Sequence, residues 1–210
     1  YGKDDNWWIA GEEGPCGPDT EMFYDTGKEP CGPDCGPSCD CGKYVEIWNN
    51  VFMEYLKKDG KLTKLAQKNV DTGMGLERIT FLLQGKQTPF DTELFLPIMN
   101  KLQELSQNDN IESRRIVAEH LRASMMIASD GVRPSNIDRG YILRRLIRRM
   151  TRHLNRLGIG LDELENLIDL DIETLKEMYP ELENNKALIK EVILSEKDKF
   201  MKTLVRGERE

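Results

Sequence analysis

The feature that most constrains this chain is a change in its hydrophobic pattern near residue 91. Residues 1–43 are rich in Gly, Pro, Cys and Asp, and residues 44–56 are largely β-branched and aromatic, which is typical of strands. From residue 91 onward, apolar residues recur with the 3.6-residue period of helices. We therefore predict an α+β chain: part of an antiparallel sheet in a first domain, residues 1–90, and an all-helical second domain, residues 91–210.

Turn residues divide the first domain into short strands. Asp59-Gly60 is a favourable two-residue hairpin turn, so the runs on either side of it are predicted to pair. A further strand begins near residue 69 and passes through Thr72–Gly75 into a helix from about Leu76. The other predicted strands are 22–25, 44–56 and 61–65, and the rest of residues 1–43 is predicted to form loops and turns.

The helical domain is predicted to contain five helices, of which the third has an apolar stripe and an arginine face. Pro134-Ser135-Asn136 supplies a stop for the preceding helix and a polar cap, and Gly158 is predicted to end the third helix. The predicted helices are 91–106, 112–129, 138–157, 162–178 and 184–205. The stripe comprises Ile142, Leu143, Leu146, Ile147, Met150, Leu154 and Leu157.

The arginines form a basic block inside an acidic chain. The net charge is −7, yet Arg133–Arg156 contains eight arginines and one acid, Asp138, so this block carries +7 and the remainder carries −14. Such a block marks a surface where a polyanion can bind. Because the block contains Arg and no Lys, contact with phosphate or RNA is favoured over a merely solvated helix face.

The apolar runs of the chain and its N-terminal sequence indicate where in the cell the protein is expected to be. No run of eighteen apolar residues exists, so no membrane span is predicted. No signal peptide is recognised, and a cytoplasmic protein is the simplest interpretation. The polar start without an initiator Met indicates a piece of a longer chain.

The strongest motif is Asp71-Thr72-Gly73-Met74-Gly75-Leu76-Glu77-Arg78. Two glycines let the backbone lie flat against a ligand, and the helix that follows offers free N–H groups to phosphate. An arginine in its first turn can neutralise a nucleotide. The motif resembles the third signature motif of class II aminoacyl-tRNA synthetases, and with Val70 before it, that of the alanyl-tRNA synthetases in particular.

Further motifs in the same order extend the resemblance to essentially the whole chain. They lie at 6–11, 14–21, 46–53, 118–123, 130–136, 139–145, 178–182 and 200–207. The resemblance implies a class II sheet followed by a tRNA-recognition region. It also implies an alanine–tRNA ligase that uses ATP and Mg²⁺ and acts on L-alanine and tRNA(Ala).

The resemblance also implies roles for individual residues. Trp8, Asp71, Gly73 and Asn49 would bind alanine, with Trp8 walling a small pocket and Asp71 holding the α-ammonium. Glu46, Gly75, Arg78 and Glu21 would bind ATP and Mg²⁺. Simpler alternatives are that Trp8 and Trp48 are core aromatics, that Asp71 caps a turn, and that Glu46 faces solvent.

The basic helix and the loop before it would recognise the tRNA acceptor stem. A-form RNA exposes base edges in a shallow minor groove, which short polar side chains at a helix entry can read. The candidate base contact is Asn136, which alternatively only caps the helix, and some arginines alternatively pair with acids of 162–183. The phosphate or groove candidates are Arg139, Arg145, Arg148, Arg149 and Arg152.

Four cysteines lie within eleven residues of a Gly- and Pro-rich loop, 31–41. In a reducing compartment, the set Cys31, Cys35, Cys39 and Cys41 favours a metal over disulfides, and thiolates suit tetrahedral Zn²⁺. Free thiols remain the alternative, since the spacing is not a common zinc-finger spacing. Cys16 belongs to another motif and is expected to be a site-wall residue.

Parts of a working ligase are not recognised in this sequence. Neither the first nor the second class II motif is found, so no residue is assigned as catalytic, and the 210 residues alone are predicted to be inactive unless those motifs are supplied in cis or in trans. His120 and His153 are far apart, so the zinc-containing editing domain of the family is not expected here. The alternatives are a non-catalytic tRNA- or RNA-binding module and a zinc-stabilised structural domain.

Overall fold

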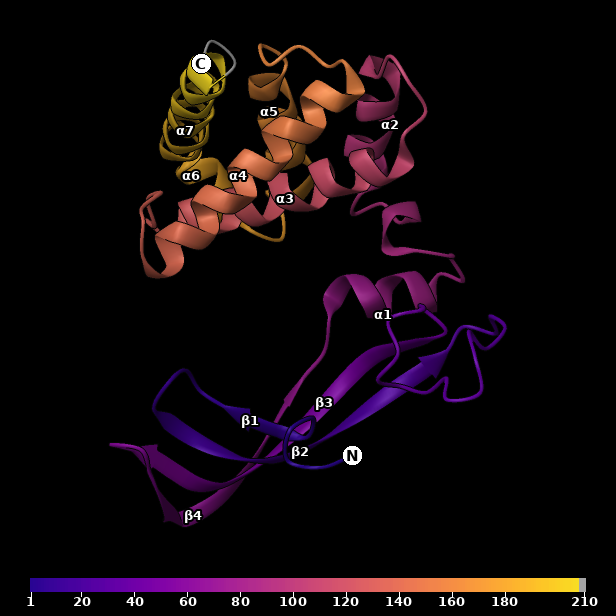
Figure 1. The fold of residues 1–210 in the computed structure, drawn as a ribbon, viewed down its shortest axis with the longest axis vertical. Helices are drawn as coiled ribbons and strands as arrows, with labels where there is room; N and C mark the ends of the chain where they lie inside the picture. Colours follow the sequence, from indigo (N-terminus) through magenta and orange to yellow (C-terminus); the bar gives the residue numbers. More distant parts are fainter. Residues whose placement is uncertain (208–210) are drawn as a thin grey trace. The chain divides into compact units, whose positions relative to one another are not determined.

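The computed structural model describes residues 1–207, which fall into two compact units (Figure 1). The first unit is Tyr1–Pro89, and the second begins at Phe90. The final three residues of the predicted helical domain, 208–210, lie outside the described residues.

A four-stranded antiparallel sheet forms the first unit, and its strand order follows the chain, β1-β2-β3-β4. A short helix, α1 (Leu76–Leu83), follows the last strand. Together with the helices of the second unit, this sheet confirms the predicted α+β class. The strands are β1 (Trp7–Ile9), β2 (Gly14–Asp25), β3 (Tyr44–Lys58) and β4 (Lys61–Gly73).

The hairpin between β3 and β4 forms where the Asp59-Gly60 turn predicts it. Lys58 pairs with Lys61, and the two turn residues have φ values of 49° and 71°, the left-handed conformation that such a turn requires. The two separately predicted strands, 61–65 and 69 onward, are one strand, because a register shift between Met53 and Tyr55 takes up the intervening residues.

The prediction that residues 1–43 are loops around one short strand is wrong for β1 and for most of β2. Gly17 and Pro18 lie at a register shift between Cys16 and Asp19, where the pairing with β3 is interrupted. A Cβ on Gly17 would collide with the carbonyl oxygen of Phe52, so a glycine is needed at this approach. These turn-forming residues therefore mark an irregularity inside a strand rather than a loop.

From the unit boundary at Pro89 onward, the described residues form helices joined by loops, and these helices match the predicted ones closely in the middle of the chain. The N-terminal helix starts later than predicted because Pro97, which lacks an N–H, sits in its first turn. The helix predicted at 184–205 is preceded by a separate short helix that begins at Pro180. The elements are η1 (Pro89–Asp91), α2 (Leu96–Leu105), α3 (Ile111–Ser129), α4 (Asp138–Leu157), α5 (Leu164–Leu175), α6 (Pro180–Asn184) and α7 (Lys186–Gly207).

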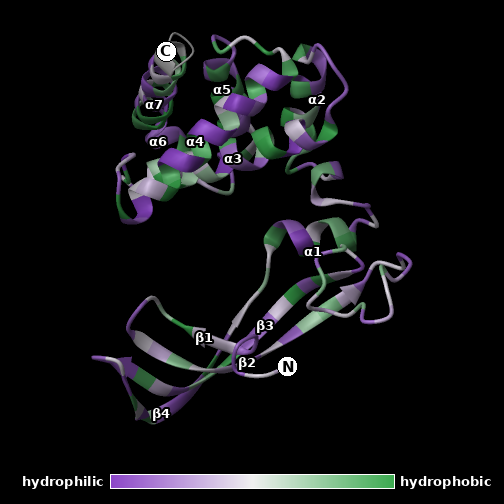
Figure 2. Cartoon of the chain, viewed as in Figure 1, coloured by the Kyte–Doolittle hydropathy of each residue, from purple (hydrophilic) through white to green (hydrophobic). Residues whose placement is uncertain are grey.

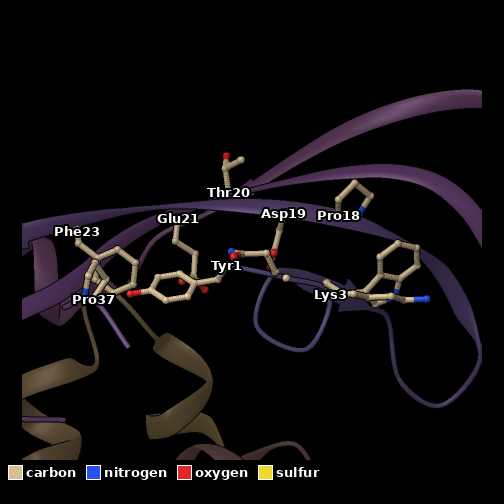
Figure 3. Close-up of a pocket in the computed structure, with 11 residues that line it drawn as sticks. Tyr1, Lys3, Pro18, Asp19, Thr20, Glu21, Phe23 and Pro37 are labelled. Atoms are coloured by element: carbon tan, nitrogen blue, oxygen red, sulfur yellow. The ribbon is translucent and has the colours of Figure 1, made fainter. Parts of the chain in front are cut away.

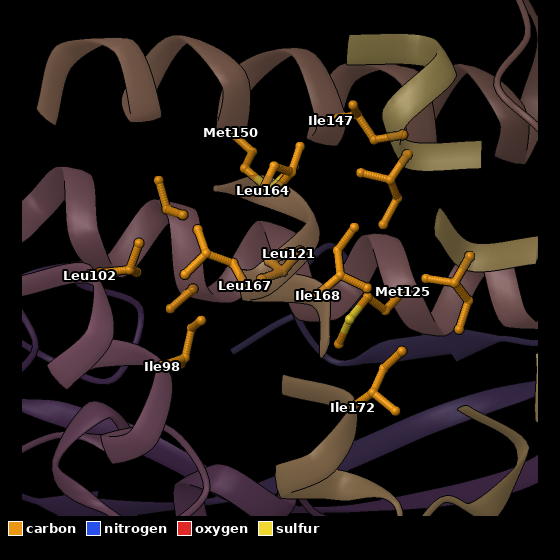
Figure 4. Packing of buried hydrophobic residues seen from close by; sticks show 14 of the residues in the cluster. Ile98, Leu102, Leu121, Met125, Ile147, Met150, Leu164, Leu167, Ile168 and Ile172 are labelled. Carbon is orange, nitrogen blue, oxygen red and sulfur yellow. The ribbon is translucent and has the colours of Figure 1, made fainter. Parts of the chain in front are cut away.

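The core of the second unit lies between these helices (Figure 4). Leu143, Ile147, Met150 and Leu154 of α4 are fully buried there, as part of the predicted stripe. Ile142 is not part of this core, since 48% of its surface is exposed. Gly158 ends α4 with a φ of 71°, as predicted. Hydrophilic and hydrophobic residues alternate along α4 in Figure 2.

One buried ion pair ties helices of the second unit together. Arg122 of α3 donates to Asp171 of α5 at 3.0 Å and also to the carbonyl oxygen of Leu94, and its guanidinium lies 3.7 Å from the ring centroid of Phe95. Because both charged groups are almost fully buried, each depends on the other. Within residues 1–207, no helix has the length and apolar character needed to cross a membrane.

Candidate functional site

Sheet pairing places two rows of residues, four of the six polar, next to each other on the first unit. One row is Glu21, Asn49 and Gly73, and the adjacent row is Asp19, Val51 and Asp71, from β2, β3 and β4 in each case. Directly opposed residues of antiparallel strands project on the same face. The sheet therefore brings together three of the four residues predicted to bind alanine: Asn49, Asp71 and Gly73.

The immediate surroundings of these three residues differ. A Cβ on Gly73 would meet no described atom within 4 Å, so the space beside this part of β4 is open. Asp71 is exposed within β4 rather than at a turn, and its Oδ1 accepts a hydrogen bond from the Thr72 amide at 2.9 Å. Its second oxygen has no hydrogen bond to a described residue, which leaves it free for a ligand.

Asp19 is a polar residue of this face that sequence reasoning missed. It is only 8% exposed, its Oδ2 accepts a hydrogen bond from the Asn49 side chain at 3.1 Å, and its Oδ1 is buried without a described partner. Recognition of β2 as a strand would have revealed it, because alternation places residues 19, 21 and 23 on one face. Figure 3 shows Asp19 and Glu21 on one side of the strand and Thr20 on the other.

The residues predicted to bind ATP and Mg²⁺ also come together. Arg78 donates from Nη1 to the Glu46 carboxylate at 2.7 Å and to the Glu46 carbonyl oxygen at 3.0 Å, so this carboxylate does not simply face solvent. Burial raises the pKa of Glu21, the negative charges of Glu46 and Asp19 raise it further, and Arg78 opposes them. A Cβ on Gly75 would lie 3.2 Å from the Arg78 side chain, so Gly75 lies beside the same arginine.

A pocket of about 660 Å³ lies on this face (Figure 3). Trp7 lines it and packs on Tyr55 with ring centroids 5.8 Å apart. Trp8 is not among the lining residues; it pairs with Gly17 and is 37% exposed, so it is not a buried core aromatic either. The other lining residues are Tyr1, Gly2, Lys3, Asn6, Pro18, Asp19, Thr20, Glu21, Phe23 and Pro37.

The arginines predicted to contact tRNA lie on α4 of the second unit, and most are exposed. Arg139, Arg145, Arg149 and Arg152 are exposed, and none forms an ion pair with a described residue. Arg148 is partly buried and pairs with Glu196 of α7 at 2.7 Å. The partner thus comes from α7, and no described α4 arginine pairs with the acids of 162–183 that were the predicted alternative.

The loop before α4 is shaped by a close approach at Gly140. The Ser135 amide donates to the Gly140 carbonyl at 3.0 Å, and a Cβ on Gly140 would lie 2.5 Å from the Arg133 carbonyl oxygen. Asn136 is exposed and does not cap the helix, because the cap position is Ile137 and the Asn136 side chain accepts a hydrogen bond from Arg144 instead.

The four clustered cysteines lie close enough to share one ion. Their Sγ atoms are all within 4.8 Å of one another, with Cys31 and Cys39 at 3.1 Å and Cys35 and Cys41 at 3.7 Å. None of the four forms a disulfide, and a hydrogen bond from the Lys43 amide lowers the pKa of Cys41 to about 7. Four sulfurs at such distances match the donor set that tetrahedral Zn²⁺ prefers. Cys16 is separate from them and fully buried in β2.

The order of motifs, the sheet and the helical unit together define the class of protein. The chain belongs to the family described as tRNA synthetases class II (A), whose model matches residues 1–210.

Within that family, the curated relatives point to one member. The chain is 47% identical to the alanine–tRNA ligase of Treponema pallidum over 98% of its length, 46% identical to that of Borreliella afzelii over 99%, and 46% identical to that of Thermotoga sp. (strain RQ2) over 98%. It spans only 36%, 37% and 25% of these three relatives, respectively.

Proposed function

We propose that this chain is part of an alanine–tRNA ligase, which activates L-alanine with ATP and transfers it to tRNA(Ala). The observation that carries the proposal is the shared face of β2, β3 and β4, where Asn49, Asp71 and Gly73 lie beside Glu21, Glu46 and Arg78. The names of the relatives support the choice of amino acid. The cytoplasm supplies the ATP and tRNA that such an enzyme requires.

Each side chain of this face offers chemistry that the reaction needs. The free carboxylate oxygen of Asp71 would hold the α-ammonium of alanine, and the open space at Gly73 would admit its small body. Glu21 and Glu46 are hard oxygen donors of the kind that Mg²⁺ prefers, and Arg78 has further N–H groups for phosphate oxygens. Trp8 is proposed as a wall of the alanine pocket on the resemblance alone.

Alanine-dependent ATP–pyrophosphate exchange in the full-length protein tests the amino-acid site. Asp71→Asn removes the charge that pairs with the ammonium, so we expect kcat/KM for alanine to fall about 10- to 100-fold. Asp59→Asn at the hairpin tip is the matched control, because Asn tolerates the same positive φ. Equal activity in both variants would contradict the proposal. Residues 1–210 alone are expected to show no exchange.

The second unit is proposed to bind the tRNA acceptor stem through α4 and the loop before it. The exposed arginines Arg139, Arg145, Arg149 and Arg152 support this role, since guanidinium groups spaced along a helix can follow an RNA backbone. Asn136 is exposed at the helix entry, where it would read base edges. A non-catalytic RNA-binding module is the second candidate, favoured if the full-length protein binds tRNA but lacks exchange activity.

A structural Zn²⁺ is proposed for the cysteine loop, held by Cys31, Cys35, Cys39 and Cys41. The support is the mutual approach of four sulfurs in a loop that has no helix or strand of its own. Purified chain should contain about one Zn²⁺ per molecule, and replacement by Co²⁺ should give the absorption of a tetrahedral thiolate site. Cys35→Ser should release the metal, whereas Cys16→Ala should retain it. Metal-free protein after refolding with Zn²⁺ would refute the site.

A further inference from the structure

Two consecutive arginines of α4 are held by partners of different charge. Arg148 donates from Nε to the carboxylate of Glu196 at 2.7 Å, and Glu196 is only 4% exposed. Arg149 donates from Nη1 to Nε2 of His120 on α3 at 3.4 Å and forms no ion pair with a described residue. The positive charge of Arg148 is therefore compensated inside the protein, whereas that of Arg149 is not.

His120 is suited to hold an arginine without cancelling its charge. Its ring is 7% exposed, and among the described residues Arg149 is its only hydrogen-bond partner. Burial lowers the pKa of His120 to about 4, and the nearby positive charge of Arg149 and the ring of His153 act in the same direction. At neutral pH the ring is uncharged, so Nε2 can accept from a guanidinium while the positive charge stays available.

The two helices enclose a pocket of about 320 Å³ at this point. Four arginines line it, Arg145, Arg148, Arg149 and Arg152, and among the described residues only Arg148 of these has an acidic partner, Glu196. Ile142 and Leu146 also line it, which explains why these members of the apolar pattern leave the core. Arginines with free N–H groups around a concave site are arranged as phosphate recognition requires.

We propose that this pocket seats one backbone phosphate of a bound RNA, with Arg149 as its ligand and His120 as the residue that positions Arg149. Arg148 has a structural role through Glu196. The apolar wall of Ile142 and Leu146 contacts the adjoining ribose. This inference rests on the proposed tRNA binding by the second unit. The sequence does not distinguish the neighbours Arg148 and Arg149, and the inference assigns the phosphate contact to Arg149 alone.

The first experiment measures tRNA affinity of the chain across a range of salt concentrations. In Arg149→Gln, we expect an affinity loss of about tenfold and a salt slope smaller by about 1, because one phosphate contact is lost. The double variant Arg148→Gln plus Glu196→Gln removes a compensated pair, leaves no unpaired buried charge, and should keep the wild-type slope. A loss of slope in the double variant as large as in Arg149→Gln would overturn the inference.

The second experiment tests His120 with two replacements of different hydrogen-bonding capacity. His120→Gln keeps an acceptor, and His120→Met fills the space without one. Thermal melts first establish that both variants are folded. The Met variant should then have a salt slope close to that of Arg149→Gln, whereas the Gln variant should keep the wild-type slope. Equal binding by both variants refutes the positioning role.

A third measurement separates the pocket from the proposed function. Inorganic phosphate added to the wild-type chain should shift the NMR signals of the Arg149 side chain and of His120, and these shifts should be absent in Arg149→Gln. If the wild-type chain shows no salt-sensitive tRNA binding, the proposed RNA function fails together with the inference. If it binds tRNA but Arg149→Gln retains the wild-type slope, only the inference fails.

Discussion

At the scale of single residues, the sheet face gathers negative charge that folding alone would avoid. Asp19, Glu21 and Glu46 lie near one another, and Arg78 supplies the nearby positive charge that opposes them. Burial and like charges both favour the neutral form of Glu21. Clustered carboxylates repel one another, and a bound cation would relieve this repulsion, which is the behaviour that the proposed Mg²⁺ site requires.

Glu21→Gln should therefore stabilise the chain at neutral pH. The pKa of Glu21 is raised in the folded state above its ordinary value of 4.5, so the folded chain holds this proton more tightly than the unfolded chain does. The free energy of unfolding of the wild type therefore falls as the pH rises from below 4.5 through the folded pKa. Solvent screening limits the gain to less than about 1 kcal/mol. Urea unfolding of both proteins at pH 7 and at acid pH measures it, and an advantage that persists undiminished below pH 4.5 would contradict the explanation.

The buried pair of Arg122 and Asp171 should tolerate the loss of one partner poorly. Asp171→Ala leaves a guanidinium buried beside Phe95 without a compensating charge, so we expect the free energy of unfolding to fall by about 3–5 kcal/mol. Chemical denaturation measures this loss. Glu104→Ala, which breaks the exposed pair with Lys101, is the control and should change stability by at most about 1 kcal/mol.

At the scale of elements, the entry to α4 depends on a glycine. Gly140→Ala places a methyl group against the Arg133 carbonyl and the Ser135 side chain, so the loop that carries Asn136 must move. We expect a stability loss of about 1–3 kcal/mol, as in other overpacked sites, together with weaker tRNA binding. Gly32→Ala is the control, since a Cβ there meets nothing within 4 Å. Unchanged tRNA affinity in Gly140→Ala would separate the loop from recognition.

The elements also show where sequence reasoning succeeds. Helix α4 has the predicted bounds, 138–157, because a strong 3.6-residue pattern and a terminal Gly158 define both its face and its end. The sequence predicts only residues 22–25 of strand β2, because Gly17 and Pro18 look like a turn, and only the pairing with β3 reveals one long irregular strand. Asp19 was missed for the same reason. Helix partners such as Glu196 and His120 depend on tertiary packing, which local patterns do not encode.

At the scale of the whole molecule, the two units differ in how much apolar surface they bury. In the first unit, the buried hydrophobic residues are Cys16, Val51 and Phe81, whereas the second unit has a continuous cluster over its helices. The sheet leaves apolar side chains such as Val70 and Phe52 exposed on paired positions of β4 and β3.

Strand β4 is the edge of the described sheet, so its free backbone groups and exposed apolar residues favour self-association. Val70 is 63% exposed and lies on the opposite face from Asp71. Val70→Lys should therefore slow aggregation of the chain, measured by light scattering during mild heating, while the thermal midpoint stays within a few degrees. Thr63→Lys adds the same charge at an exposed position of the same strand without removing an apolar side chain, so it is the control for charge. If Thr63→Lys and Val70→Lys slow aggregation equally, the apolar patch is not the cause.

The strand order of the sheet has a consequence for biosynthesis. Since each strand pairs with its immediate predecessor, every hairpin can close as soon as its second arm leaves the ribosome. The sheet face proposed to bind alanine is nevertheless incomplete until β4 has been translated, because Asp71 and Gly73 are its last residues along the chain. A ribosome stalled before residue 71 would thus carry a nascent sheet that is largely paired but lacks two residues of the proposed alanine site.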